Sequence, residues 1–309
     1  MGEMRESGLE RILLKLGEKD LLSKLVNQLS GSELNTLLLK VFSEKAKAYS
    51  PSELLNRYQE NRFVHPAKID VLKLKQLELD ILKIAFENNV PSIQLSPVAP
   101  LGTASIVGEV NQNNVISSLR GTEVVSDATN LIALHISELI KSKNYSRVEP
   151  IRFCTTHRHT RAQFFGNVPG MLPHFHLFCN VTAGVDKGSY AFEKESFWEH
   201  VILYQNIFNT IFASEIEIIF SERGGYKDCS GLISRVMDYG EQNNISVSTG
   251  EPLKENQYYK GFQFTIKTVI NGVVHFIGDG GFVDWTQKII GNKKERLLIS
   301  AIGLDRLLL

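Results

Sequence analysis

One segment near the C-terminal end strongly restricts the fold of this chain. In residues 262–268, apolar and polar side chains alternate, which puts the apolar ones on one face of a strand. The dipeptide Asn271-Gly272 follows, and it favours a two-residue hairpin turn because both turn positions need positive φ angles. The segment Val273-Val274-His275-Phe276 can then return beside the first strand. The segment predicts a β-hairpin and hence a sheet with antiparallel strands.

The middle of the chain alternates helical and strand patterns. The spacing of apolar residues predicts a long helix from residue 68 to Asn88-Asn89, and further helices over 128–141 and 197–212. Strands are expected at 92–96, 152–159 and 173–181, and the last ten residues are expected to form a helix. We therefore predict an α+β fold, with a mostly antiparallel sheet flanked by helices.

The first 66 residues differ in pattern from the rest. They carry four short stretches with leucines at helical spacing, and Ser50-Pro51-Ser52-Glu53 has the composition of a helix start. We predict a small N-terminal helical unit over residues 1–66 that has no chemistry of its own. Residues 67–309 are expected to form the second domain.

The composition restricts the partners and the location of the protein. The 309 residues include 34 basic and 34 acidic side chains, so the formal net charge is zero. This balance gives no indication of a nucleic-acid surface, which would need a basic excess or stripe. The three cysteines form no C-x-x-C pair, which is typical of reduced intracellular thiols. No apolar run approaches the roughly 20 residues of a membrane span. We expect a cytoplasmic protein without a membrane partner.

Several short motifs follow one another in a recognisable order. Residues 125–130 read VSDATN, residues 157–163 read HRHTRAQ, and residues 174–176 read HFH. Residues 254–264 read KENQYYKGFQF, residues 280–284 read GGFVD, and residues 303–306 read GLDR. Together with the long helix after residue 68, these blocks resemble the catalytic domain of the class II aminoacyl-tRNA synthetases. They are most similar to histidyl-tRNA synthetase and its paralogues without an anticodon-binding domain.

The resemblance implies activation of a carboxylate by ATP, bound with Mg²⁺. Such a reaction needs a cation at the α-phosphate, where negative charge builds. The resemblance implies that Arg158 contacts the α-phosphate. It also implies that Phe175 stacks under the adenine and that Arg306 binds the terminal phosphates. Thr160 takes the place of the glutamate that accepts from the adenine amino group, and Lys254 takes the place of a catalytic arginine.

The resemblance also predicts a substrate pocket. Asp127 and Thr129 are expected near the amino group of the substrate. Leu177 and Val181 replace the polar residues that hold the imidazole in histidyl enzymes, so histidine is not the expected substrate. A small or apolar amino acid, or a related carboxylate, is expected instead. The other pocket residues implied by the resemblance are Tyr258, Tyr259 and Asp284.

Two functional interpretations remain open. In the first, the chain is a ligase that passes an acyl-adenylate to an acceptor other than tRNA, such as a carrier protein, a lysine or a small amine. In the second, it is a catalytically inactive paralogue that acts as a regulatory or ligand-sensing subunit. The chain stops directly after the last motif, so no anticodon-binding domain is expected. In both interpretations, a homodimer is expected, built on the helix and strand around Leu72 to Pro97.

Two H-x-H pairs could indicate a metal site. His157 and His159 lie on one expected strand, and His174 and His176 on its neighbour. Four imidazoles on one face would suit zinc. However, if Arg158 and the aromatic residue between His174 and His176 face the pocket, the histidines face away from it. We therefore expect packing or interface histidines and no metal.

Overall fold

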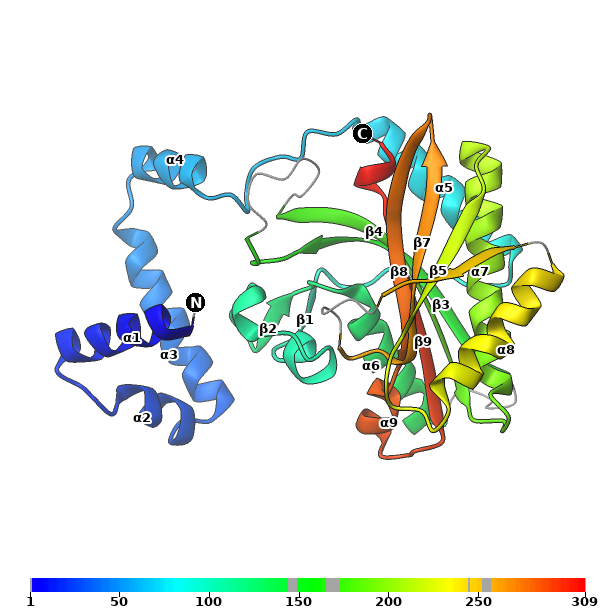
Figure 1. Cartoon of the computed structure of the whole chain (residues 1–309). Coiled ribbons are helices and arrows are strands. Elements are labelled where there is room, and N and C mark those ends of the chain that lie inside the picture. Colours follow the sequence, from blue (N-terminus) through cyan, green and yellow to red (C-terminus); the bar gives the residue numbers. More distant parts are fainter. Residues whose placement is uncertain (1, 144–148, 165–172, 244, 252–256, 309) are drawn as a thin grey trace.

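A computed structural model of the chain describes residues 2–143, 149–164, 173–243, 245–251 and 257–308 (Figure 1). Within the described residues, no helix has both the length and the apolar character needed to cross a bilayer. The larger part of the chain is built around one sheet, and its strands are β3 (Ile151–Thr160), β4 (His174–Val185), β5 (Ile216–Glu222), β6 (Ser246–Thr249), β7 (Lys260–Ile270), β8 (Val273–Val283) and β9 (Glu295–Gly303).

The seven strands follow the order β3-β4-β9-β8-β7-β5-β6. Every neighbouring pair is antiparallel except β5 and β6, which are parallel. The sheet is therefore mostly antiparallel, and the predicted α+β class is confirmed. The hairpin is also confirmed, since Asn271 and Gly272 have φ angles of 51° and 77° between β7 and β8.

Helices cover both faces of the sheet. One face packs against α5 (Val71–Glu87), α7 (Ala191–Phe212) and α8 (Cys229–Gln242), and this layer holds the larger apolar core. The other face is covered by α6 (Ala128–Lys141) and α9 (Trp285–Ile290), which pack on a smaller apolar core. A two-stranded sheet of β1 (Val98–Pro100) and β2 (Thr122–Val124) precedes α6. The candidate site lies on the α6 face.

The long helix α5 has two apolar faces. Its N-terminus is capped by the side chain of Asp70, which accepts a hydrogen bond from the backbone N–H of Lys73. One face packs into the core through buried residues such as Leu74 and Ile81. A second stripe points to solvent, and its side chains are 83 %, 48 % and 77 % exposed at Leu72, Leu79 and Phe86. The helix can therefore pack against two partners.

The N-terminal helices lie beside the sheet domain (Figure 1). They are α1 (Gly2–Leu16), α2 (Leu21–Asn27), α3 (Gly31–Lys47) and α4 (Pro51–Glu60), and capping boxes begin both α3 and α4. None of the described residues in α2, α3 or α4 is buried. Asn35 accepts from the backbone N–H groups of Arg120 and Gly121, and Arg62 donates to the carbonyl of Ala162. The helices are present as predicted, and the domain boundary at residue 66 stays a prediction.

Two predicted elements are wrong. Residues 92–96 form no strand, because only Ser92 makes a single bridge, to Cys154. The last ten residues are not a helix either: β9 ends at Gly303, and a single 3₁₀ turn follows over Asp305–Leu307. The apolar run of β9 is explained by its central place in the sheet, where Ile299 pairs with Val181 on one side and Gly281 on the other.

Candidate functional site

The register of β3 and β4 decides which motif residues share a face. His159 is directly opposite Phe175, and Arg158 is directly opposite His176. Residues opposite each other in an antiparallel pair point to the same side of the sheet. Phe175 therefore shares its side with His159, and the two rings are stacked with centroids 5.9 Å apart. Arg158 points to the other side.

This register corrects the expected position of Arg158. Its exposed guanidinium donates to Nδ1 of His174, which in turn bonds the carbonyl of His65. Thr160 is two residues further along β3 and points the same way as Arg158. Neither residue faces Phe175, so the predicted arrangement of Arg158, Thr160 and Phe175 around one nucleotide is wrong. The alternation of side chains along β3 correctly predicted that Arg158 and Thr160 point to the same side of the sheet. Only the pairing of β3 with β4 shows that this is the side opposite to Phe175.

The four histidines are split between the two faces. His157 and His159 lie on the Phe175 side, and His174 and His176 lie on the Arg158 side. All four are buried. The prediction that all of them face away from the pocket is therefore wrong for the first pair. No set of four imidazoles on one face exists for zinc among these residues.

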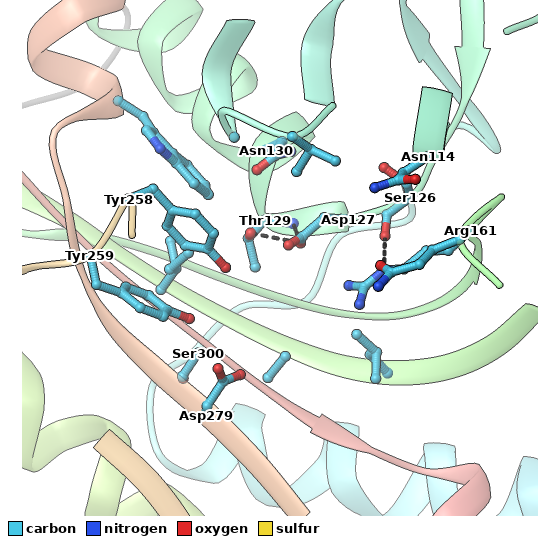
Figure 2. A pocket seen from close by; sticks show the side chains of 17 residues that line it. Asn114, Ser126, Asp127, Thr129, Asn130, Arg161, Tyr258, Tyr259, Asp279 and Ser300 are labelled. Atoms are coloured by element: carbon cyan, nitrogen blue, oxygen red, sulfur yellow. Dashed lines mark hydrogen bonds between the residues drawn. The ribbon is translucent and has the colours of Figure 1, made fainter. Parts of the chain in front are cut away.

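A cavity of about 190 Å³ lies between α6 and the sheet (Figure 2). Its floor is formed by residues of β4, β8 and β9, and its walls come from α6, from α9 and from the segments before β2, before α6, after β3 and before β7. The lining residues are Gly108, Val110, Asn114, Ser126, Asp127, Thr129, Asn130, Arg161, Gln163, Leu177, Tyr258, Tyr259, Asp279, Trp285, Ile299, Ser300 and Ala301. Five of the seven predicted substrate residues are among them: Asp127, Thr129, Leu177, Tyr258 and Tyr259.

Asp127 and Thr129 are held together at the start of α6. Asp127 is the N-cap residue, and its Oδ1 accepts from the backbone N–H of Thr129 at 2.9 Å and from the Thr129 hydroxyl at 2.7 Å. An acidic N-cap is favoured by the backbone donors and the dipole of the helix. This bonding fixes the carboxylate at the cavity wall (Figure 2).

Arg161 links the cavity to Phe175. Its Nε donates to the carbonyl of Ser126 at 3.0 Å, and its guanidinium carbon lies 5.1 Å from the centroid of the Phe175 ring. Arg161 also lines the cavity, whereas Arg158 does not. The sequence analysis assigned Arg161 no role, although it lies one residue beyond the end of β3 and two residues after His159, so it continues the alternation of the pocket-facing side.

Tyr258, Tyr259 and Asp279 gather at the other side of the cavity (Figure 2). Burial, followed by the nearby charge of Asp279, raises the pKa of Tyr258 and of Tyr259 above the usual value. Both phenols therefore keep their protons. The side-chain amide of Gln263 donates to Oδ2 of Asp279 at 3.0 Å. Asp279 was missed in the sequence, where its signal is an acid set between the glycines of GDGG in a strand.

The remaining predicted site residues lie outside the cavity lining. Val181 is completely buried and packs in the apolar core beside Ile299, its partner on the neighbouring strand. Asp284 forms ion pairs with Lys260 and Lys288, at 3.8 Å and 3.0 Å. Lys254 lies outside the described residues. Neither Val181 nor Asp284 is in direct reach of a ligand in the cavity.

Arg306 lies beside Gly303, on the face of the sheet that carries the cavity. Gly303 pairs with Leu177, so a Cβ on Gly303 would point to the face that carries the cavity. Such a Cβ would be 3.5 Å from Cδ of Arg306. The aliphatic part of the exposed Arg306 side chain therefore runs along the same face as Phe175 and Leu177. The side chain of the preceding residue, Asp305, accepts from the backbone N–H of His176 and anchors the turn.

One cluster has the residue types of a metal site. Asp127, His159 and Cys179 each have a potential ligand atom within 4.8 Å of the others. However, Nε2 of His159 accepts a 2.8 Å hydrogen bond from the backbone N–H of Ala128, so the ring proton belongs on Nδ1. Neither ring nitrogen then has a lone pair to offer. Burial also raises the pKa of the Cys179 thiol well above its usual value, which disfavours the thiolate. The cluster is thus a poor metal site.

Comparison with known sequences gives no relative. No sequence-family profile matches the chain, and no curated protein matches it.

Comparison with solved structures does give matches. The apo histidyl-tRNA synthetase of S. aureus aligns with a TM-score of 0.57 and 14 % identity, over 76 % of this chain and 64 % of that one. An ATP phosphoribosyltransferase regulatory subunit/histidyl-tRNA synthetase from Bacillus halodurans C aligns with a TM-score of 0.59 and 15 % identity, over 81 % and 82 %. A histidine–tRNA ligase subunit from Alicyclobacillus acidocaldarius gives a TM-score of 0.59 and 11 % identity, over 81 % and 96 %.

At such low identities the alignments demonstrate a shared fold, and this chain spans less than two thirds of the S. aureus enzyme. The resemblance predicted from the motifs is confirmed at that level. The chain has the fold of the catalytic domain of the class II aminoacyl-tRNA synthetases, as found in histidyl-tRNA synthetases and their regulatory-subunit relatives.

Proposed function

We propose that this protein uses ATP to activate the carboxylate of a small amino acid or related acid, and that it transfers the acyl group to an acceptor other than tRNA. The observation that carries the proposal is the position of Arg161. Its guanidinium lines the amino-acid-sized cavity and also lies over the ring of Phe175. One cation thus stands between a pocket for an acid and an aromatic surface suited to a purine.

The chemistry of adenylate formation explains why such a cation matters. A carboxylate oxygen of the substrate attacks the α-phosphorus of ATP, and the bond to pyrophosphate breaks. Negative charge increases on the α-phosphate during this step, and a preorganised guanidinium stabilises it. Arg161 is preorganised because its Nε is already bonded to the carbonyl of Ser126. We assign it the role that the sequence resemblance gave to Arg158.

The nucleotide is proposed to lie on the face that Phe175 shares with Gly303. Phe175 would stack on the adenine, and Arg306, which runs along Gly303, would reach the terminal phosphates. We expect ATP to bind as its Mg²⁺ complex, in which the ion offsets phosphate charge. The amino group of the substrate would meet Asp127 and Thr129, whose mutual hydrogen bonds fix their positions.

The proposed partners follow from the charge and from α5. Because the chain has equal numbers of acidic and basic residues, the proposed acceptor is a carrier protein, a protein lysine or a small amine rather than tRNA, and the proposed protein partner is a carrier protein or an enzyme. The exposed stripe of α5 supports a homodimer. A cytoplasmic location remains the prediction made from the sequence.

A second function is favoured by one observation. In the observed register, His159 rather than Thr160 faces Phe175, and its Nε2 already accepts from the backbone of Ala128. A neutral imidazole whose acceptor nitrogen is already hydrogen-bonded cannot accept a hydrogen bond from the amino group of adenine. This favours a regulatory or ligand-sensing subunit that binds a small molecule without activating it. The name of the Bacillus halodurans structure gives a regulatory subunit beside a histidyl-tRNA synthetase, so this fold is also associated with a regulatory role.

Chemical trapping distinguishes the two functions. The protein is incubated with Mg²⁺–ATP, hydroxylamine and a panel of amino acids, and hydroxamate and AMP are measured. The ligase interpretation predicts stoichiometric formation of AMP and one hydroxamate, and loss of both in Arg161→Ala. A protein that binds an amino acid in calorimetry but releases no AMP with any acid would support the regulatory interpretation and refute the ligase.

A further inference from the structure

The N-terminal helical unit is joined to the candidate site by one short segment, residues 62–65. The segment begins two residues after the end of α4, and the centroid of the His65 ring lies 5.0 Å from that of Tyr58 in α4. Among the described residues, the apolar clusters of the sheet domain include none before Ile69. The segment is therefore attached by hydrogen bonds rather than through a shared apolar core.

Arg62 is bonded to the backbone just beyond β3. Its guanidinium donates to the carbonyl of Ala162 and, at 3.3 Å, to the carbonyl of Gln163. The guanidinium carbon also lies 4.2 Å and 5.5 Å from the ring centroids of Phe63 and Phe164. A planar guanidinium that donates to two consecutive carbonyls restrains the direction of the chain as well as its position.

The backbone held in this way carries Arg161. β3 ends one residue earlier, so this stretch lies outside the regular ladder with β4. The amides of Arg161 and Ala162 donate to the carbonyls of Pro173 and Asn114, each at 2.9 Å. Backbone with few such bonds opens more readily than a central strand. The two bonds from Arg62 therefore restrain a stretch that would otherwise open easily.

The same segment is bonded to β4. Nδ1 of His174 accepts from an arginine of β3, so Nε2 carries the ring proton and donates to the carbonyl of His65 at 2.7 Å. His174 is the first residue of β4 and is directly opposite Thr160, the last residue of β3. Phe175 follows it in the chain. Residues 62–65 are therefore bonded to both strands at the same end of the sheet.

We propose that Arg62 is a positioning residue for Arg161. Through it, residues 62–65 clamp this end of β3 and β4 and keep Arg161 over Phe175. The inference rests on the proposed function for the catalytic role of Arg161, and it adds how that cation is kept in place. The N-terminal unit then has no chemistry of its own, but it controls the geometry of a residue that does.

Amide hydrogen exchange on the full chain tests the clamp without any ligand. Arg62→Ala removes both donors and should speed exchange at the amides of Arg161 and Ala162 at least about tenfold, because this stretch then opens more often. The amide of Phe178, in the middle of β4, should exchange at the wild-type rate. A general loss of stability would instead speed exchange at all three amides.

The matched control is Arg57→Ala. Arg57 is another arginine of the N-terminal unit, and its guanidinium carbon lies 3.9 Å from the ring centroid of Tyr49. Its removal should leave exchange unchanged at all three amides. Unchanged exchange beyond β3 in Arg62→Ala, an equal increase in the middle of β4, or the same local increase in Arg57→Ala would overturn the clamp.

A double-mutant cycle tests the link to catalysis. Arg62→Ala should reduce the kcat of ATP–pyrophosphate exchange about tenfold in the wild-type background. The reduction should be less than about twofold when Arg161 is already alanine, because two changes that act through one contact are not additive. No reduction in the first background, or an equal reduction in both, would overturn the positioning role. Absence of exchange in the wild type would refute the proposed function instead, and hydrogen exchange would still decide the clamp.

Discussion

The guanidinium carbon of Arg161 lies 5.1 Å from the centroid of the Phe175 ring, on the side of the sheet opposite to Arg158. A cation over an aromatic face is attracted by the ring and is held in a defined orientation. Arg161 is held a second time by the carbonyl of Ser126. These contacts give the candidate site a fixed cation at the point where an acid and a nucleotide would meet.

Nucleotide binding should depend on Arg306 and not on Arg158. Arg306→Ala should weaken binding of an ATP analogue by about 1.5–3 kcal/mol, the scale of a charge-assisted hydrogen bond. Arg158→Ala changes an exposed side chain on the opposite face and should alter binding by less than about 0.5 kcal/mol. Calorimetry with both variants checks this. A larger loss for Arg158→Ala would restore the role that the sequence assigned to it.

The exposed stripe of α5 should hold a homodimer together. Leu72, Leu79 and Phe86 are seven residues apart, so they lie close to one line along the helix. Leu79→Glu would bury a charge in that interface and should shift the protein to monomers in sedimentation at micromolar concentration. Leu54→Glu, on the exposed surface of α4, is the matched control and should leave the mass unchanged. A wild-type monomer would contradict the prediction.

Stability should fall as the pH is lowered, in part because of His200. Burial, together with the charge of Arg152, lowers the pKa of His200 from 6.5 to about 3. Below pH 6.5 the unfolded chain therefore binds a proton that the folded protein excludes, so the free energy of unfolding decreases as the pH falls. From pH 7.5 to 5.5 this group should cost about 1.4 kcal/mol.

The variant His200→Gln checks this prediction. His200 is hydrogen-bonded to Thr182 and Ser300, and glutamine can retain polar contacts there without titrating. His200→Gln should therefore lose about 1.4 kcal/mol less stability than the wild type between the two pH values. Denaturant unfolding at both pH values measures the difference, and equal pH dependence in the two proteins would be the contrary result.

The protein should not charge tRNA efficiently. Its 34 acidic residues balance its 34 basic ones, so it has no overall excess of positive charge to follow a long anionic partner. Filter binding and charging with total cellular tRNA at near-physiological salt tests this. Stable aminoacylation of one tRNA species would contradict the prediction and would indicate a synthetase.

The fold could be predicted from the sequence where a pattern was local. Asn271-Gly272 predicted the hairpin, because few other dipeptides adopt two positive φ angles. The end of the chain could not be predicted in this way. A strand buried on both faces has a continuous apolar run, and such a run does not distinguish a strand from a helix.

The candidate site shows a similar limit. Asp127 and Thr129 were found because residues 125–130 resemble a family loop that binds the amino group of the substrate, and their hydrogen bonds to each other appear only in the structure. The choice between Arg158 and Arg161 depended on the pairing of β3 with β4, which joins residues far apart along the chain. Asp279 was missed because its partners across the cavity come from other strands and loops, and only the folded sheet brings them together.

ATP–pyrophosphate exchange tests the central claim most directly, because label enters ATP only when an acid has been activated reversibly. The wild-type protein should exchange with one or a few small amino acids. Arg161→Ala should reduce exchange by about 10²-fold or more, as expected for a lost transition-state contact, and Arg158→Ala should retain it within a few fold. Absence of exchange with every amino acid tested, from a protein that unfolds cooperatively, would contradict the account.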